Sequence, residues 1–362
     1  MQPVLEKAVT DTNTLPMHGG DLDAANARYG TPAVGWLDLS TGINQTAYPI
    51  GDVPSETWQS LPSRSALDRT LAAARNAYAA KPDTPIVAAP GAQAIIQVLP
   101  QLRRNARVAI VGPTYSEHAR AWANAGARVS AITEVDLHAA DDVDVVVVVN
   151  PNNPTGRSWP TAPLLMLARV LAERDGLLIV DESFADAMPS RQLTRHCGQR
   201  GLLVMRSFGK FYGLAGLRLG FALGHQTEIN RLRDLLGPWA VSGPALAIAE
   251  QALSDTEWAN KMKARLNADS QNLAMLLEAE AFELIGQTPL FVTAAHAAAS
   301  SIHADLARAG IWTRAFDYAP DWLRFGVPDT AGLARLQAAL DVAPATAKRW
   351  LRERPPGQER GR

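Results

Sequence analysis

The sequence predicts an α/β fold in which a large domain with a mostly parallel sheet precedes a smaller α/β C-terminal domain. Short apolar segments alternate with helical patterns through the middle of the chain, which is typical of a sheet covered by helices on both faces. A turn-rich segment at 237–244 then leads into a long helical pattern and a second group of short strands. The chain has 362 residues, which is enough for two such domains.

The expected elements of the large domain follow one another in chain order. Helical spacing predicts a helix over 65–80, with Ser65 as the candidate N-cap. Short apolar runs predict buried strands, and further helical patterns separate them. The strands are expected at 86–89, 107–111, 128–132, 143–149, 177–180, 202–206 and 217–223, and the helices at 91–102 and 163–174.

The smaller domain is expected to begin with one long helix over 245–279. Short strands follow near Glu283, Leu290, Ile311 and Trp322, and a helix is expected over 302–309. The basic tail at 346–362 contains prolines and is predicted to be a solvated end of the chain.

Composition and charge exclude several classes of function. The formal net charge of −1 gives no field that would attract nucleic acid or an anionic membrane. Cys197 is the only cysteine, so a disulfide within the chain and a cysteine-rich metal site are excluded. Residues 1–15 lack the apolar core of a signal peptide, and the longest aliphatic run, 143–149, is too short to cross a bilayer. We therefore expect a cytoplasmic protein without a metal site.

One glycine-punctuated segment, SFGKFYGLAGLRLG at 207–220, is the most informative part of the chain. It places Lys210 in a loop, three residues after Ser207 and eight before Arg218. An amine that forms a Schiff base with a phosphorylated cofactor needs a hydroxyl and a guanidinium nearby for the phosphate. The segment resembles the lysine signature of the fold-type I enzymes that use pyridoxal phosphate (PLP), the class I/II aminotransferase superfamily.

That resemblance implies the fold-type I architecture and a role for each residue of the segment. Lys210 is the catalytic amine that binds PLP covalently, and Ser207 and Arg218 hold the cofactor phosphate. It also implies that residues 1–50 form an N-terminal segment packed on the active site and the small domain. Residues 51–240 and 241–345 are then the large and the small domain.

Two motifs upstream strengthen the resemblance. The run NPNNPTG at 150–156 is similar to a turn of the superfamily whose asparagine, here Asn153, donates to the phenolic oxygen of PLP. Asp181 follows four apolar residues, a place where a carboxylate is costly to bury without a partner. The resemblance makes that partner the pyridine nitrogen of PLP. A plain turn and a helix-capping aspartate are the alternatives, and Glu182 is expected in a structural ion pair.

Three further segments have weaker patterns. Gly91, Ala92 and Gln93 lie between a strand and a helix, where free amides suit a phosphate, although a plain turn is the alternative. The resemblance implies that Tyr115 stacks on the pyridine ring, with core packing as the alternative. Arg324, in the run WLRFGVP, is similar to the superfamily arginine that binds a substrate carboxylate, with a salt bridge at the rim as the alternative.

The N-terminal region resembles one particular group within the superfamily. The runs HGGD at 18–21 and DLSTGIN at 38–44 are similar to the threonine-phosphate decarboxylases of cobalamin biosynthesis, a group within the superfamily. This resemblance implies that His18, Gly19 and Asn44 bind substrate, although an unstructured N-terminal histidine is the alternative. Many aminotransferases of the superfamily have tyrosine where this chain has Phe184, and the decarboxylase group commonly has phenylalanine.

Three functions remain open at this point. The first is PLP-dependent decarboxylation of L-threonine O-3-phosphate to (R)-1-amino-2-propanol O-2-phosphate and CO₂. The second is an aminotransferase that acts on histidinol phosphate or an aromatic amino acid. The third is a PLP-binding module without catalysis, which is disfavoured because the chain has no DNA-binding motif. The expected partners are a small phosphorylated amino acid and a second copy of the chain, with no nucleic acid and no membrane.

Overall fold

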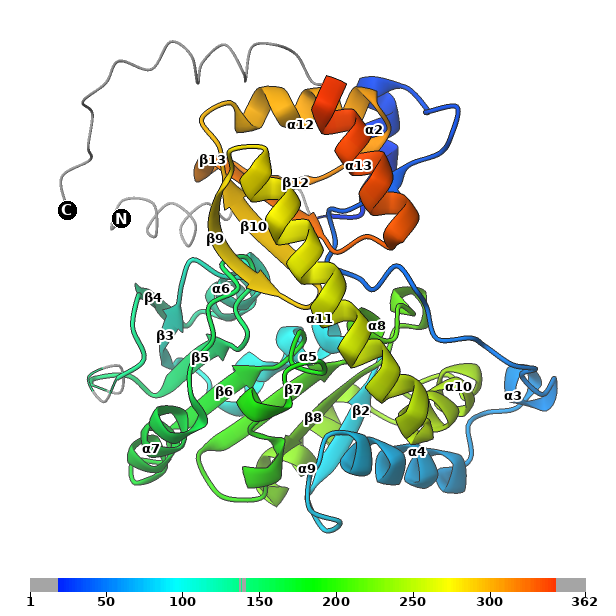
Figure 1. Ribbon diagram of the computed structural model, residues 1–362. Coiled ribbons are helices and arrows are strands. Elements are labelled where there is room, and N and C mark those ends of the chain that lie inside the picture. The colour runs from blue at the N-terminus through cyan, green and yellow to red at the C-terminus, as the bar shows by residue number, and fades with distance from the viewer. Residues whose placement is uncertain (1–18, 137, 139–140, 343–362) are drawn as a thin grey trace.

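The computed structural model describes residues 19–136, 138 and 141–342, which form two domains (Figure 1). The large domain is built on a seven-stranded sheet with the strand order β2-β8-β7-β6-β5-β3-β4. All neighbouring strands are parallel except β8, which is antiparallel to both β2 and β7. The mostly parallel sheet is thus confirmed. The strands are β2 (Ile86–Ala89), β3 (Arg107–Val111), β4 (Arg128–Ile132), β5 (Val145–Val149), β6 (Leu177–Asp181), β7 (Leu202–Ser207) and β8 (Gly220–Gly224).

Helices cover both faces of this sheet, which explains why its central strands are apolar throughout. Val146 and Val148 of β5 belong to the core on one face, while Val145 and Val147 belong to the core on the other. The first face is covered by α4 (Arg64–Ala77), α7 (Thr161–Ala172) and α10 (Gly243–Ser254). The second is covered by α5 (Ala92–Val98), η1 (Leu99–Leu102), α6 (Ser116–Asn124) and α9 (Gln226–Leu236).

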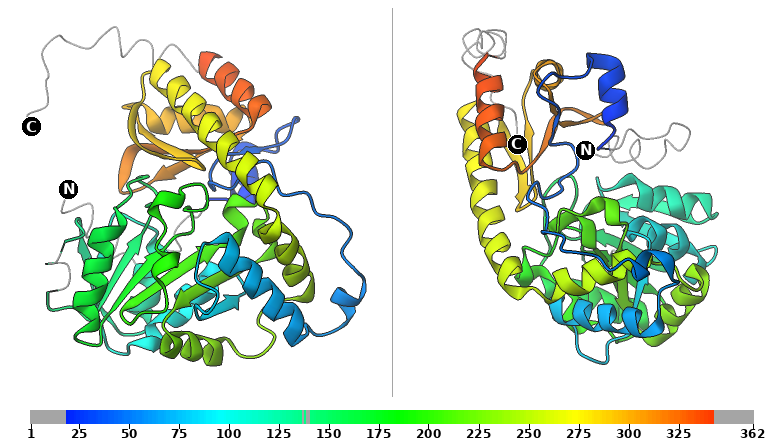
Figure 2. Two further views of the ribbon diagram at one scale, coloured as in Figure 1. Left: turned by 60° about the horizontal axis from the view of Figure 1, so that its bottom comes forward. Right: turned by 90° about the vertical axis from the view of Figure 1, so that its right-hand side faces the viewer.

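The small domain contains a four-stranded antiparallel sheet in the order β12-β13-β10-β9. Its strands are β9 (Glu283–Thr288), β10 (Phe291–Ala295), β12 (Arg314–Phe316) and β13 (Ala319–Gly326). Three helices pack on it, α11 (Thr256–Ala279), α12 (Ala299–Arg308) and α13 (Thr330–Val342). In both views of Figure 2, α11 runs from the large domain to the small domain.

The N-terminal segment belongs structurally to the small domain. Its strand β1 (Leu37–Asp38) pairs in parallel with β11 (Ile311–Trp312), and its helix α2 (Leu22–Tyr29) contacts α12. The remaining short helices are α3 (Glu56–Gln59), α8 (Phe208–Phe211), η3 (Pro189–Arg191), η4 (Thr194–His196) and η5 (Ala215–Leu217).

Two helix boundaries differ from the prediction because of capping side chains. Ser63, rather than Ser65, caps α4 by accepting a hydrogen bond from the backbone of Ala66. The single helix expected over 245–279 is divided at Asp255, whose carboxylate accepts from the backbone N of Trp258 and begins α11. Hydrophobic periodicity alone does not reveal such a break.

The predicted domain boundary after residue 240 separates α10 from the helix on which it packs. Thr70 of α4 donates to the backbone carbonyl of Leu246 in α10, and Arg69 pairs with Glu250 at 2.9 Å. Because α10 completes the large-domain core, Asp255 is the better boundary. The tail at 346–362 lies outside the described residues.

Candidate active site

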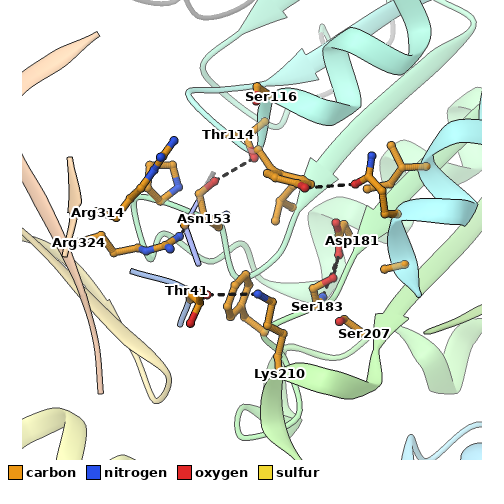
Figure 3. Close-up of a pocket in the computed structure, with 18 of the residues that line it drawn as sticks. Thr41, Thr114, Ser116, Asn153, Asp181, Ser183, Ser207, Lys210, Arg314 and Arg324 are labelled. Carbon is orange, nitrogen blue, oxygen red and sulfur yellow. Dashed lines mark hydrogen bonds between the residues drawn. The ribbon is translucent and has the colours of Figure 1, made fainter. Parts of the chain in front are cut away.

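A cavity of about 260 Å³ lies where the carboxyl ends of β5, β6 and β7 face the small domain. Figure 3 shows side chains from both domains and from the N-terminal segment turned toward it. Many of the predicted residues line it, namely Gly19, Ala92, Gln93, Tyr115, Asn153, Asp181, Ser207, Lys210, Arg218 and Arg324. Residues from seven separate parts of the sequence therefore form one site.

Lys210 lies in α8, directly after β7, and its amine points into the cavity. Nζ donates to the backbone carbonyl of Thr41 at 3.2 Å and lies 5.5 Å from the ring centroid of Phe184. Burial, and after it the charge of Arg324, lowers the pKa of Lys210 to about 8. An amine with this pKa is available as a nucleophile near neutral pH.

Asp181 ends β6 and is buried at the floor of the cavity. Its carboxylate accepts from His118 Nε2 at 3.0 Å, and from the backbone N and hydroxyl of Ser183 at 2.9 and 2.5 Å. Burial alone raises the pKa of this carboxyl, but the contacts with His118 and Ser183 outweigh burial, and the pKa is lowered. Asp181 is therefore an anion that faces the cavity, which suits a protonated ring nitrogen.

The next residue, Glu182, points away from the cavity into the large-domain core. Its carboxylate lies 2.9 Å from Nη1 of Arg206, and Asp186 lies 3.0 Å from Nη2 of the same guanidinium. All three side chains are buried. Glu182 is therefore part of a structural ion pair, as the sequence predicts.

Asn153 and Arg324 form one hydrogen-bonded pair on the wall opposite Asp181. Arg324 donates to the side-chain oxygen of Asn153 and to the backbone carbonyl of Ser40. Because Oδ1 of Asn153 is an acceptor, its Nδ2 is left to donate. Burial, and after it the charge of Arg314, lowers the pKa of Arg324 to about 10.

The backbone at the start of α5, together with Arg218 and β8, forms a cradle that has room only because residues 91 and 220 are glycines. Gly91 has a φ of +85°, and a Cβ at this position would lie 2.6 Å from Nη2 of Arg218. A Cβ at Gly220 would lie 2.5 Å from the backbone N of Ala92. Glycine at these positions brings Arg218 and β8 against the free amides of the helix. With Ser207 at the end of β7, these groups fit a phosphate, and the site as a whole fits PLP.

Tyr115 lines the cavity, and its hydroxyl donates to Oε1 of Gln93 at 3.2 Å. Its ring meets His118 edge-on, with the centroids 6.3 Å apart. Burial raises the pKa of Tyr115 to about 12, so the phenol keeps its proton. The side chain of Gln93 is engaged with Tyr115 and Glu117, which leaves its backbone amide for the predicted phosphate contact.

The structure does not bring Asn44 into the cavity as the predicted substrate contact. Its side chain is buried, donates to the carbonyl of Phe211 at 2.9 Å and accepts from the backbone N of Thr46. Its own backbone N donates to the carbonyl of Lys210. Asn44 therefore holds the lysine turn in place, and both ends of its amide are occupied. The prediction for His18 lies outside the described residues.

Arg314, Tyr318 and His118 are among the side chains of the site that the sequence prediction did not name. Arg314 and Tyr318 line the cavity, and His118 lies behind Asp181. Arg314 is directly opposite Arg324 in the β12–β13 pair, and Figure 3 shows the two guanidinium groups on the same side of the pocket. Both arginines lie close to the short strands expected near Ile311 and Trp322, but the pairing that sets them opposite each other was not predicted. His118 lies in the first turn of α6, three residues after the N-cap residue Tyr115, which brings the two rings together.

The comparison with protein families matches residues 59–340 to the family described as aminotransferase class I and II. This span covers most of the chain and contains every large-domain motif of the site. The chain belongs to this family.

Two curated members of the family are similar to the chain over nearly all of its length. The threonine-phosphate decarboxylase of Pseudomonas aeruginosa is 44% identical over 325 residues, which cover 89% of this chain and 96% of the relative. The protein of the same name from a Sinorhizobium species is 44% identical over 328 residues, covering 90% of this chain and 97% of the relative. A histidinol-phosphate aminotransferase of Thiobacillus denitrificans is 34% identical over 57% of this chain and 55% of its own length.

Solved structures support the fold. A histidinol-phosphate aminotransferase from Sinorhizobium meliloti in complex with pyridoxal-5′-phosphate has a TM-score of 0.76 at 20% identity, covering 92% of this chain and 96% of that one. The L-threonine-O-3-phosphate decarboxylase from Porphyromonas gingivalis has a TM-score of 0.70 at 19% identity, covering 84% of this chain and 98% of that one. Across the residues that the structure describes, no helix has both the length and the apolar character needed to cross a membrane.

Proposed function

We propose that this protein is a PLP-dependent decarboxylase of L-threonine O-3-phosphate and acts in cobalamin biosynthesis. The observation that carries the proposal is the pair of guanidinium groups, Arg314 and Arg324, which line the same cavity as Asp181 and Lys210. Threonine phosphate has two anionic groups, a carboxylate and a phosphate, and each suits one planar guanidinium. The similarity to two threonine-phosphate decarboxylases over about 90% of the chain supports the same substrate.

The residues of the cavity divide between the cofactor and the substrate. Lys210 would hold PLP covalently, Asp181 would pair with its ring nitrogen, and Asn153 would donate to its phenolic oxygen through Nδ2. Ser207, Arg218 and the amides that begin α5 would hold its phosphate. When bound, PLP supplies a cationic ring that withdraws the electron pair of the breaking bond.

The protein side chains then control which bond breaks and where the proton goes. Arg324 binds the substrate carboxylate and Arg314 the phosphate, which fixes the substrate at two points. The bond from Cα to the carboxylate carbon breaks, and CO₂ leaves without its electron pair. Lys210, with its pKa near 8, returns one proton to Cα. Solvent then restores the proton to the amine, so each turnover consumes one proton and needs no amino acceptor.

A specific observation separates this reaction from the alternative, an aminotransferase on histidinol phosphate. Histidinol phosphate has no carboxylate, so one of the two guanidinium groups, the half-buried Arg314 or the buried Arg324, would have no anion to bind when it occupies the site. The ring of Phe184 also lies over the lysine amine without a hydroxyl to donate to the cofactor. Both features favour the decarboxylase.

The proposal includes a homodimer and a cytoplasmic location. Exposed apolar side chains are found near α3 and in the loop before α10, with Trp58, Leu61 and Trp239 each more than half exposed. Beside them lies a second cavity of about 260 Å³ whose lining includes Pro62 and Trp239. A second copy of the chain is the occupant that symmetry favours for such a surface. A doubly charged phosphate ester does not cross membranes freely, which favours an enzyme in the compartment where its substrate is made.

The test is a substrate panel in which CO₂ release and the formation of glutamate from 2-oxoglutarate are measured in parallel. L-Threonine O-3-phosphate is expected to release CO₂ and form the amino-propanol phosphate. Histidinol phosphate with 2-oxoglutarate is expected to give no glutamate. Glutamate formation without CO₂ from threonine phosphate would contradict the proposal and favour the aminotransferase.

A further inference from the structure

The hydroxyl of Tyr115 is hydrogen-bonded to Gln93, whose side-chain amide is in turn hydrogen-bonded to Glu117. We propose that Gln93 and Glu117 are positioning residues for Tyr115: together they fix the direction of its hydrogen bond and hold its ring against the cofactor. The inference rests on the proposed function in so far as PLP is the group that the ring faces. It concerns one residue of the cavity wall, Gln93 on α5, and one residue behind it, Glu117 on α6.

Glu117 sets the direction of the hydrogen bonds that lead to Tyr115. Its side chain is buried, with 7% of its surface exposed. Its Oε2 accepts from Nε2 of Gln93 at 2.9 Å and from Nε2 of Gln97 at 3.4 Å. Its Oε1 lies 3.6 Å from a guanidinium nitrogen of Arg120. A carboxylate can only accept hydrogen bonds, so the NH₂ group of Gln93 must face Glu117. The amide oxygen of Gln93 is therefore turned toward Tyr115.

This orientation determines what the Tyr115 hydroxyl can do. The amide oxygen of Gln93 is an acceptor, so the phenol must donate its one hydrogen to it, across 3.2 Å. The hydroxyl then has no hydrogen left for a phosphate or a substrate oxygen in the cavity. Tyr115 can contribute only its ring face and its lone pairs there, which makes it a stacking surface rather than a donor.

The same contact limits rotation of the ring. The phenol is tethered at its oxygen by Gln93, and its edge meets the imidazole of His118, which in turn binds Asp181 at 3.0 Å. The ring plane and the carboxylate that faces the cofactor nitrogen are thus held by one connected set of contacts. We expect loss of the tether to loosen the ring and to weaken PLP binding without a change of fold.

The experiment is a double-mutant cycle on Gln93→Leu and Tyr115→Phe, read by the dissociation constant of PLP and by the visible circular dichroism of the bound cofactor. Either single variant is expected to raise the dissociation constant roughly fivefold, the loss typical of one intramolecular hydrogen bond, and to reduce the dichroic band. The double variant is expected to be no weaker than either single variant, because both remove the same contact.

Gln97→Leu is the matched control. Gln97 lies one turn after Gln93 on α5 and donates to the carboxylate of Glu117, but it does not line the cavity. This variant is expected to leave the dissociation constant and the dichroic band unchanged. Glu117→Gln keeps the shape of the side chain but no longer forces the NH₂ group of Gln93 to face it. The dissociation constant of PLP for this variant should therefore lie between those for the wild type and for Gln93→Leu.

Several outcomes would overturn the assignment. If the effects of Gln93→Leu and Tyr115→Phe multiply in the double variant, Gln93 acts independently of Tyr115. If Gln97→Leu weakens PLP binding as much as Gln93→Leu, the effect is one of general packing. If Glu117→Gln has the same dissociation constant for PLP as the wild type, Glu117 does not position Tyr115. Wild-type protein that binds no PLP would instead contradict the proposed function, and this assignment with it.

Discussion

Lys210 has a lowered pKa because the influences that disfavour its ammonium form exceed those that favour it. Burial and the charges of Arg324 and Arg218 disfavour the ammonium form, whereas the carboxylates of Asp181 and Asp38 favour it, and the pKa settles at about 8. The position of Arg324 thus serves two purposes, because the guanidinium that suits a carboxylate also keeps the amine partly neutral. This balance makes the reactivity of the amine sensitive to pH in the physiological range.

The first prediction concerns that pH dependence. The rate at which PLP attaches to PLP-free protein should rise with pH and level off above about pH 8, because only the neutral amine attacks an aldehyde. Arg324→Leu removes a charge that lowers the pKa of Lys210, so the midpoint should move upward. Rapid-mixing absorbance measurements over a pH series test both. A midpoint near 10.5, the ordinary lysine value, would contradict the assigned environment.

The second prediction concerns Asp181. Asp181→Asn is expected to keep the fold but to lower kcat by at least about 100-fold, since a buried charge-assisted contact is worth ~3 kcal/mol. Steady-state kinetics together with far-ultraviolet circular dichroism measure this. Ser183→Ala is the companion variant, because it removes one of the hydrogen bonds to Asp181 but leaves its charge, and its effect should be much smaller. A loss of less than about threefold for Asp181→Asn would remove it from the cofactor role.

Sequence patterns were sufficient to predict which residues line the cavity when those residues lie inside contiguous motifs. Lys210, Asp181 and Asn153 each have neighbours in the chain that define the local turn, so their placement in the cavity follows from short-range information. His118 and Arg314 are different, because their roles arise from contacts with residues far away in the sequence. Asn44 lies inside a run that resembles the decarboxylase group, and it was therefore predicted to bind substrate. In the structure its side chain and its backbone N instead contact the lysine turn.

At the scale of elements, the site depends on close approaches between backbones. β8 passes so near the start of α5 that Gly220 has no room for a side chain, and Gly91 lies directly under Arg218. In the small domain, the antiparallel register of β12 and β13 sets Arg314 opposite Arg324. Apolar runs and periodicity predicted the strands of the large sheet and several helices, but not α2, α6, α9 and α13. Neither the register of β12 and β13 nor the break at Asp255 is encoded in a period.

The third prediction tests the close approach at Gly91. Gly91→Ala should weaken PLP binding and lower stability, because the new Cβ meets the Arg218 guanidinium at 2.6 Å and φ is +85°. We expect a loss of about 1 kcal/mol or more in the free energy of unfolding from the backbone conformation alone. Gly216→Ala is the matched control, since a Cβ there meets nothing within 4 Å. Equal thermal unfolding and PLP affinity for the two variants would contradict the cradle.

At the scale of the whole molecule, the cavity is assembled from three parts of the chain. Thr41 of the N-terminal segment accepts from Lys210 of the large domain, and Arg324 of the small domain donates to the carbonyl of Ser40 and to Asn153. The division into two domains was predicted from the sequence. The boundary was not, because α10 resembles the start of the next domain in sequence while it packs on α4 in space.

The fourth prediction concerns the proposed dimer. Leu61→Asp places a charge on a side chain that is 67% exposed next to Trp58, and it should shift the protein toward the monomer. Met275→Asp changes a side chain that is 59% exposed on α11, away from this surface, and serves as the control. Sedimentation velocity gives the mass of each. A wild-type protein that is monomeric, or a Leu61→Asp variant that remains dimeric, would contradict this surface as the interface.

The most direct test of the central claim is the number of CO₂ molecules released per subunit from L-threonine O-3-phosphate when no 2-oxo acid is present. Decarboxylation returns the cofactor to its starting form, whereas transamination converts it after a single turnover. With Lys210 as proton donor, the account predicts sustained CO₂ release over many turnovers, and one solvent deuterium at the former Cα when the reaction runs in D₂O. Release of no CO₂, or an end to turnover after one equivalent of substrate per subunit, would contradict it.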